Sequence, residues 1–197
     1  GLADYVTLIP NQLIEKLENN PEVNVSYHNS WTNEFYLLNT KKPPTDNLWF
    51  RRAIASSLDR NTLSTYIYKN TGVASKGLIP QNIPLFLEPD SLIDFDLDAA
   101  RRYLKKSGLK PSNLNVDLSY VSTYEAYRLT AFMLLDNLKK IGVKLDLKPG
   151  LWSTNWDKAK NLDTSPNIIS MAWWPTISSP SDWFLSLYGS QESPLFN

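Results

Sequence analysis

Residues 47–68 show apolar positions at helical spacing more clearly than any other part of the chain. The first half repeats apolar or small residues at i, i+3, i+4, i+7 and i+8: Phe50, Ala53, Ile54, Ser57 and Leu58. That spacing places them on one face of an α-helix. Asp59 then interrupts the pattern, and its carboxylate can accept hydrogen bonds from the free N–H groups of a second helix. Leu63, Tyr66 and Ile67 form that helix's apolar face, so the pattern predicts two helices that meet at a corner.

The remaining pattern predicts further helices and strands in mixed order. Helices are expected near 13–17, 96–108, 125–141, 152–161 and 181–188. Strands are expected at 4–9, 23–27, 34–38, 116–121, 143–147 and 167–172. The strand, helix and strand within 116–147 have the lengths of a right-handed βαβ unit with parallel strands. Residues 69–94 are interrupted by prolines and are expected to be irregular. This order predicts an α/β fold with a mixed sheet and helices packed on it.

Composition limits the size of the core and the kinds of partner. The chain has 197 residues, of which 42% are hydrophobic and 20% charged, enough for one sizeable core or two small ones. Twenty basic and twenty acidic residues cancel, which gives no support to a nucleic-acid or anionic-membrane partner. Apolar runs such as 132–135 are far too short to span a bilayer. Residues 1–3 carry no leader pattern, so we expect either a cytoplasmic protein or a piece of a longer exported one.

Residue types that carry catalysis are scarce and poorly placed. The sequence has no cysteine and one histidine, His28, which excludes thiolate chemistry and disfavours a structural zinc site. It has neither a glycine-rich phosphate loop nor a Gly-x-Ser-x-Gly elbow. Asp94, Asp96 and Asp98 alternate, but capping of the following helix explains them more simply than a calcium loop does. We therefore expect no enzymatic activity, no cofactor and no metal.

Tryptophans near strand ends suggest a binding surface instead. Trp173 and Trp174 follow directly on an apolar strand, and ligands of α/β folds gather beyond the carboxyl ends of strands. Adjacent strand residues face opposite ways, so one of the two is expected in the core. Aromatic faces can stack on a peptide side chain or a sugar ring, and nearby hydroxyls can donate hydrogen bonds. The expected ligand-facing set is Trp173, Trp174, Thr176, Trp156, Trp152, Tyr120 and Ser122.

Several short motifs occur together in a recognisable order. They are Asn39 with the loop 40–46, Arg51-Arg52-Ala53, Asp59-Arg60, Ile79-Pro80, Phe95 to Ala100, Leu104 to Gly108, Leu138 to Val143 and Ala172-Trp173 through Pro180. Each is unspecific alone, but the ordered set resembles the extracytoplasmic solute-binding proteins of ABC transporters. The family in question includes the oligopeptide-, dipeptide- and nickel-binding proteins, and the resemblance extends over nearly all 197 residues.

This resemblance implies a lobe of a larger protein. Family members are considerably longer, carry an export signal and fold as lobes that close over a ligand. Residues 1–197 would then form a single C-terminal lobe of the periplasmic-binding-protein type II-like fold, similar to domain 3 of dipeptide-binding proteins. The first lobe and the export signal would lie outside this chain. The implied function is capture of a small solute outside the cytoplasm for a membrane permease, without chemical conversion. The alternative is the sensor domain of a transcriptional regulator that uses the same lobe.

The sequence departs from the family at one position that bears on the ligand. In oligopeptide binders an aspartate three residues after the tryptophan pairs with the ligand's terminal amine, and here Thr176 stands at that place. Threonine cannot offer a charge-assisted hydrogen bond to an ammonium group. Asp182 is nearby, but stabilisation at the first turn of the last helix is enough to explain it. The solute is therefore left open between a peptide and an oligosaccharide-like molecule.

Overall fold

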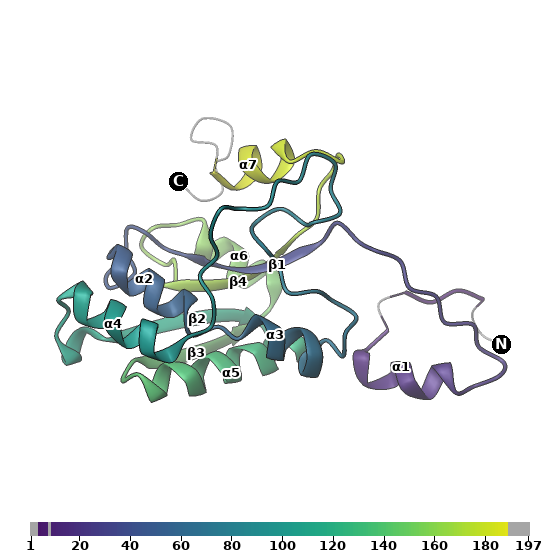
Figure 1. Ribbon diagram of the computed structural model, residues 1–197, viewed down its shortest axis with the longest axis horizontal. Coiled ribbons are helices and arrows are strands. Elements are labelled where there is room, and N and C mark those ends of the chain that lie inside the picture. Colours follow the sequence, from purple (N-terminus) through teal and green to yellow (C-terminus); the bar gives the residue numbers. More distant parts are fainter. Residues whose placement is uncertain (1–3, 8, 189–197) are drawn as a thin grey trace.

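A mixed β-sheet lies at the centre of the computed structural model, which describes residues 4–7 and 9–188 (Figure 1). Within these residues four strands pair in the order β1-β4-β2-β3. They are β1 (Asn33–Leu38), β2 (Asn115–Val121), β3 (Lys144–Gly150) and β4 (Ile168–Trp173). β1 runs antiparallel to β4, whereas β2 is parallel to both β4 and β3. The α/β class and the mixed sheet expected from the sequence are confirmed.

The βαβ unit consists of β2, α5 (Glu125–Lys140) and β3, as the spacing predicted. The buried stripe of α5 includes Ala131, Leu134 and Leu138, which pack on the sheet. Gly142 ends the helix with φ +84°, and the N–H of Val143 donates to the carbonyl of Leu138 at 2.9 Å. This is the hydrogen-bond pattern of a helix that stops at a left-handed glycine. It turns the chain directly into β3.

One face of the sheet is covered by α5 together with α2 (Leu48–Ala55) and α4 (Leu97–Ser107). Phe50 of α2 and Ala100 of α4 are fully buried in this main core, where they join Leu118 of β2. Asp96 caps α4 by accepting from the N–H groups of the second and third residues after it, at 2.8 and 2.9 Å. Gly108 follows the helix with φ +68°. Both helix boundaries predicted here are confirmed.

The second helix of the predicted corner changes its winding after one turn. Asp59 caps α3 (Arg60–Thr62) by accepting from the Thr62 N–H at 3.0 Å, as expected. The helix then continues as η1 (Leu63–Ile67), a π-helical segment closed by a hydrogen bond from the Tyr68 N–H to the Leu63 carbonyl. The wider turn carries Tyr68 toward β1, where it contributes to the groove described below.

The opposite face of the sheet packs against a smaller core. Its members come from α6 (Trp152–Ala159), α7 (Ser181–Tyr188) and the irregular segment 78–83. Met171, Trp183 and Leu187 are buried there, with Ile83 closing the cluster. Figure 1 shows α7 with a loop of the irregular segment beside it. The remaining short helix, η2 (Pro111–Asn113), leads into β2. None of the described helices is long and apolar enough to cross a membrane.

The N-terminal segment differs from the sequence prediction. Helix α1 (Asn11–Glu18) forms as expected, but the strands predicted at 4–9 and 23–27 are wrong, because the described residues of both runs form no strand. The apolar run 4–9 and the alternating run 23–27 are each suitable for a strand, but a strand also needs a neighbour to pair with. Figure 1 shows α1 standing apart from the sheet at the end of a long extended connection. The described residues that precede β1 therefore pair with no strand of the sheet.

Candidate ligand-binding site

The turn beyond β4 presents the tryptophan pair as the alternation predicted. Trp173 is half-buried and packs against the smaller core, whereas the Trp174 side chain is 64% exposed. Thr176 is exposed two residues further along. One carboxylate oxygen organises this turn, because Oδ2 of Asp182 accepts from Nε1 of Trp173 at 3.2 Å and from the Thr176 N–H at 3.3 Å. Asp182 therefore has a structural role that its position in the first turn of α7 did not reveal.

Helix α6 adds a second aromatic surface. The rings of Trp152 and Trp156 stack with centroids 5.4 Å apart and planes inclined by 24°. Trp156 packs against the same small core as Trp173, and Trp152 is 39% exposed. The ammonium of Lys160 lies 5.7 Å from the centre of the Trp156 ring. The small core thus connects the α6 tryptophans with the turn that follows β4.

Tyr120 and Ser122 lie at the end of β2 but differ in exposure. Tyr120 is 4% exposed and its ring belongs to the main core, so its side chain does not reach a surface. Its carbonyl accepts from Nδ2 of Asn155 at 2.9 Å, which ties β2 to α6. Ser122 is exposed, and its hydroxyl donates to the Gly150 carbonyl at 3.2 Å. The seven residues expected from the sequence to face a ligand therefore stay a prediction. Tyr120 is the exception, because its buried ring cannot contact a ligand.

A groove of about 860 Å³ opens along the edge strand β1, at the same end of the sheet. Its walls come from β1 and the preceding residues 27–32, the helical corner, residues 70–82 and the first turns of α5. None of the seven predicted residues lines it. In the register of β1 and β4, Asn33 is opposite Trp173 and Glu34 is opposite Ala172. The groove and the Trp173 turn are therefore one residue apart along the strands, with Asn33 on the sheet face of Trp173 and Glu34 on the opposite face.

The polar centre of this groove is a carboxylate surrounded by phenols. Glu34 accepts a hydrogen bond from the Tyr68 hydroxyl, and Tyr36 and Tyr127 also line the groove. Crowding by the groove walls raises the pKa of the Glu34 carboxyl above its usual value, although water reaches it through the open mouth. Burial away from water raises the pKa of all three phenols, and the negative charge of Glu34 raises it further. The hydroxyls therefore stay protonated, and each can donate a hydrogen bond.

The sequence pattern did not predict this groove, because it is local and the groove is formed by residues distant in the sequence. Glu34 occupies one position of an alternating strand, where a charged residue normally indicates the solvated face. Its partner Tyr68 is 34 positions away and is placed by the π-helical segment, which the apolar pattern does not distinguish from an ordinary helix. The available signal was a glutamate within the aromatic run Asn33–Leu38, since charged side chains are rarely enclosed among apolar ones.

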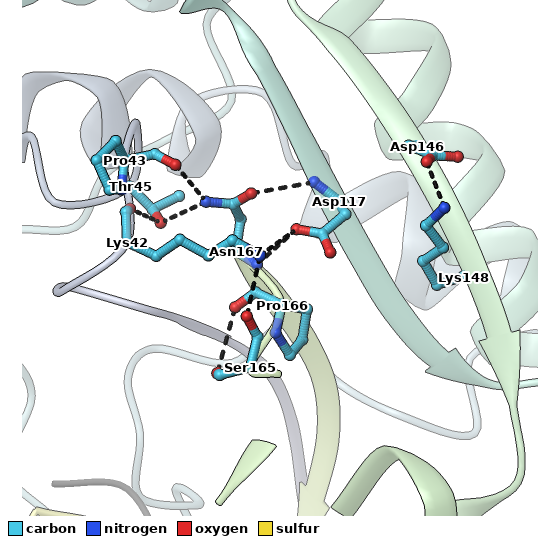
Figure 2. A network of polar contacts seen from close by, with 9 residues as sticks. All are labelled: Lys42, Pro43, Thr45, Asp117, Asp146, Lys148, Ser165, Pro166 and Asn167. Atoms are coloured by element: carbon cyan, nitrogen blue, oxygen red, sulfur yellow. Dashed lines mark hydrogen bonds and ion pairs between the residues drawn. The ribbon is translucent and has the colours of Figure 1, made fainter. Parts of the chain in front are cut away.

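The opposite end of the sheet holds a polar network that is structural (Figure 2). Asn167 donates from Nδ2 to the Pro43 carbonyl and the Thr45 hydroxyl, at 3.0 and 3.1 Å. Its backbone N–H donates to Oδ1 of Asp117 at 2.8 Å, and Nζ of Lys42 lies 3.3 Å from the same oxygen. The network fastens the proline-containing loop after β1 to β2 and β4. A shallow second groove of about 380 Å³ lies over Asp117 and Asn167.

The described residues offer no organised catalytic or metal-binding set. They contain no group of three or more histidines, aspartates or glutamates that could hold a metal ion. The His28 ring, with Nε2 3.2 Å from the Ser26 hydroxyl, is exposed near the end of the extended connection. The Asp96 carboxylate is occupied by the N-terminus of α4, and backbone hydrogen bonds lower its pKa.

Comparison with known proteins gives consistent matches over the chain. The model of the bacterial extracellular solute-binding proteins, family 5 Middle, matches residues 1–194. The dipeptide-binding protein of Escherichia coli is 24% identical over 195 residues, covering 97% of this chain and 34% of that protein. The oligopeptide-binding protein OppA of Bacillus subtilis is 28% identical over 164 residues, covering 78% of this chain and 29% of that protein. The chain thus spans about a third of the length of these curated relatives.

Solved structures show the same fold. NikA from Staphylococcus aureus in complex with Ni(L-His)2 superposes with a TM-score of 0.82 at 18% identity, covering 96% of this chain and 41% of that one. A dipeptide-binding protein from Pseudoalteromonas sp. in complex with Met-Leu gives a TM-score of 0.79 at 19% identity, covering 94% and 38%. With a family match over almost its whole length, this chain belongs to the bacterial extracellular solute-binding proteins of family 5.

Proposed function

We propose that this chain captures a small solute for an ABC transporter and releases it chemically unchanged. The family match over residues 1–194 carries the proposal. The exposed Trp174 and the pinned turn beyond β4 support it, because they form a ready-made surface where α/β folds bind ligands. The relatives it resembles are named as binding proteins rather than enzymes, which agrees with the lack of an organised catalytic set in the described residues.

A peptide is the first candidate for the solute. The relatives are named for dipeptides, di- and tripeptides, oligopeptides, heme and nickel, and none of these names supports an oligosaccharide ligand or a transcriptional regulator. The Thr176 N–H is already bound by Asp182, so the turn contributes to a ligand mainly through the exposed Trp174 ring and the Thr176 hydroxyl. This is a surface for packing and neutral hydrogen bonds.

The proposal includes the setting in which the chain works. It acts as one lobe of a longer protein, outside the cytoplasm, and a membrane permease receives the solute from the closed complex. A relative from Salmonella typhimurium, named as a periplasmic peptide transport protein, is 22% identical over 189 residues and supports this location. Aromatic residues left exposed on the single lobe are then covered by the ligand and by the facing lobe.

A thermal-shift screen of the complete gene product tests the proposed function. The panel consists of di- to pentapeptides, nickel with histidine, and small oligosaccharides. A ligand at a hundredfold excess over its Kd stabilises the folded state by about 2.7 kcal/mol, which such a screen detects easily. We expect stabilisation by peptides, with the peptide recovered intact afterwards. Stabilisation by oligosaccharides alone, cleavage of the peptide, or no response to the whole panel would each contradict the proposal.

A further inference from the structure

The Glu34 carboxylate in the β1 groove has no cation to balance it. Within residues 4–7 and 9–188, no ion pair to Glu34 is formed. His28 and Arg60 also line the groove, but neither pairs with Glu34. Nε2 of His28 lies 3.2 Å from the Ser26 hydroxyl, whereas Nη2 of Arg60 donates to the Ile93 carbonyl at 2.9 Å and lies 3.6 Å from Oδ1 of Asp94. The Tyr68 hydroxyl bound to Glu34 is a neutral donor. The Glu34 carboxylate, open to solvent at the groove mouth, is therefore hydrogen-bonded but not paired with a cation.

A second polar group in the groove lacks a partner altogether. The Tyr36 hydroxyl is buried and makes no hydrogen bond to any described residue. Tyr36 and Glu34 are two positions apart on β1, so their side chains lie on the same face of the sheet. A buried hydroxyl without a partner costs stability, and the Glu34 carboxylate beside it is a charge without a counter-ion. Their occurrence together in one groove is expected where a ligand completes the missing contacts.

We propose that the β1 groove binds the ammonium group of a cationic solute, with Glu34 as its counter-ion and the Tyr36 hydroxyl as an additional hydrogen-bond acceptor. The amino terminus of a short peptide has this chemistry. A carboxylate and an ammonium group form a charge-assisted hydrogen bond, and the surrounding tyrosine rings favour a cation near their faces. This inference rests on the proposed function and names how that site distinguishes its solute.

The position of the groove supplies what the Trp173 turn lacks. Threonine at position 176 cannot neutralise an amine, whereas Glu34 offers a full negative charge. Glu34 pairs in register with Ala172, directly before Trp173. A peptide with its amine at Glu34 therefore lies at the same end of the sheet as the exposed Trp174 ring. An anionic solute is disfavoured by the same carboxylate, and a metal ion would need more ligands than one carboxylate provides.

Titration calorimetry on the complete gene product tests the inference with a matched pair of probes, trialanine and N-acetyl-trialanine. Acetylation removes the ammonium charge and leaves the rest of the peptide unchanged. Glu34→Gln removes the carboxylate charge at nearly constant shape. Glu88→Gln is the control, because Glu88 is exposed, pairs with Lys76 and does not line the groove. Tyr36→Phe removes the orphaned hydroxyl.

We expect wild type to bind trialanine at least tenfold more tightly than N-acetyl-trialanine. Glu34→Gln is expected to abolish this preference by weakening trialanine binding at least tenfold while leaving N-acetyl-trialanine unchanged. Tyr36→Phe should weaken trialanine binding severalfold, and Glu88→Gln should match wild type. Thermal unfolding of each variant verifies that it is folded.

Two results overturn the inference while leaving the proposed function intact. One is a wild-type protein that binds both probes equally. The other is a Glu34→Gln variant that keeps the preference for trialanine or loses affinity for both probes alike. If wild type binds neither probe and no other peptide in the thermal-shift panel, the proposed peptide function fails and the inference fails with it.

Discussion

Asp182 and Trp173 are joined across the turn that follows β4, with Oδ2 of the carboxylate 3.2 Å from Nε1 of the indole. The same oxygen accepts from the Thr176 N–H, so a single atom fixes both the core-facing tryptophan and the backbone at position 176. This arrangement sets the conformation of the surface on which Trp174 is displayed. It also explains why an aspartate close to the expected ligand is engaged by the protein itself.

Removing this carboxylate should loosen the turn. Hydrogen bonds to charged groups contribute about 1.5–3 kcal/mol, so we expect Asp182→Ala to lower the free energy of unfolding by about 2 kcal/mol. Asp182→Asn keeps an acceptor oxygen and should lose less. Urea unfolding followed by tryptophan fluorescence measures both. Asp157→Ala, at an exposed carboxylate paired with Lys160, is the control and should change stability by less than about 0.5 kcal/mol. Equal stability of Asp182→Ala and wild type would show that the two contacts hold nothing together.

Ionisation of Glu34 should lower the free energy of unfolding as the pH rises. Burial by the groove walls raises the pKa of its carboxyl, so the folded state binds a proton more tightly than the unfolded chain does. The charged form is therefore disfavoured in the folded state, and this penalty appears as the pH rises through the raised pKa. Tyr36 on β1, Tyr68 directly after η1 and Tyr127 on α5 surround the group and are neutral throughout this range.

We therefore expect Glu34→Gln to be more stable than wild type at pH 7 and equal to it at pH 4, below the usual glutamate pKa. Urea unfolding at both pH values measures the difference. Because the carboxylate is open to solvent on one side, the gain should be modest. A variant that is less stable than wild type at pH 7 would show that the ionised carboxylate supports the fold, contrary to the cost argued here.

Trp174 should matter for the ligand and hardly at all for the fold. Its side chain is 64% exposed, so Trp174→Ala is expected to change stability by less than about 0.5 kcal/mol. Exposed tryptophans that become buried on binding often contribute 2 kcal/mol or more, which corresponds to about a thirtyfold loss of affinity. Calorimetry with the peptide found in the screen measures this loss. Tyr66→Ala, at another exposed aromatic residue that does not line the groove, should leave affinity unchanged.

The network at Asn167 should be the more costly one to break. Its side chain forms three hydrogen bonds in a buried position, to the Pro43 carbonyl, the Thr45 hydroxyl and the Asp117 N–H. Asn167→Ala leaves these partners unsatisfied, and each buried unsatisfied group costs about 1–3 kcal/mol, so we expect a loss of about 3 kcal/mol. Asn24→Ala in the exposed connection is the control. Denaturation midpoints of the two variants that coincide would contradict the prediction.

The 197-residue chain alone should bind its solute weakly. Pockets for small molecules bury about 70–90% of the ligand surface, and one lobe provides roughly half of that. Half of a micromolar binding free energy, about 4 kcal/mol, corresponds to a Kd of about 1 mM. The aromatic surface left uncovered should also produce weak self-association in sedimentation velocity. Calorimetry of this chain with the ligand of the complete gene product measures its affinity. Micromolar binding would contradict the prediction, because it would place the whole site within the chain.

Elements whose signals are local were readable from the sequence. Asp96 and Gly108 mark the two ends of α4 because a cap side chain and a left-handed glycine act on neighbouring backbone groups. The βαβ unit followed from the order and length of its parts. The Trp173–Trp174 alternation was predictable for the same reason, since a strand turns successive side chains to opposite faces.

Features that depend on distant partners were not readable. The apolar run 4–9 and the alternating run 23–27 each resemble a strand, but the described residues of both pair with no strand. Glu34 gained its surroundings from Tyr68 and Tyr127, which arrive from the helical corner and from α5. Tyr120 lies near the end of β2 and Ser122 just past it, and it is packing in the main core that buries the Tyr120 ring. Tertiary contacts decided each of these outcomes.

Asn33 joins the start of β1 to a segment that is distant in the sequence. Its buried amide donates to the Gly77 carbonyl at 2.9 Å and also to the Leu78 carbonyl, so it clamps the start of β1 to the irregular segment. The exposed connection 20–32 reaches the sheet at this residue. The N-terminal segment is also held by Asn11 of α1, which donates to the Ile67 carbonyl at 3.4 Å, and by the Ser30 carbonyl, which accepts from Nδ2 of Asn82 at 3.1 Å. Asn33 lies one residue from Glu34 and directly across from Trp173, so a substitution that releases its amide would disturb the supports of both candidate ligand surfaces.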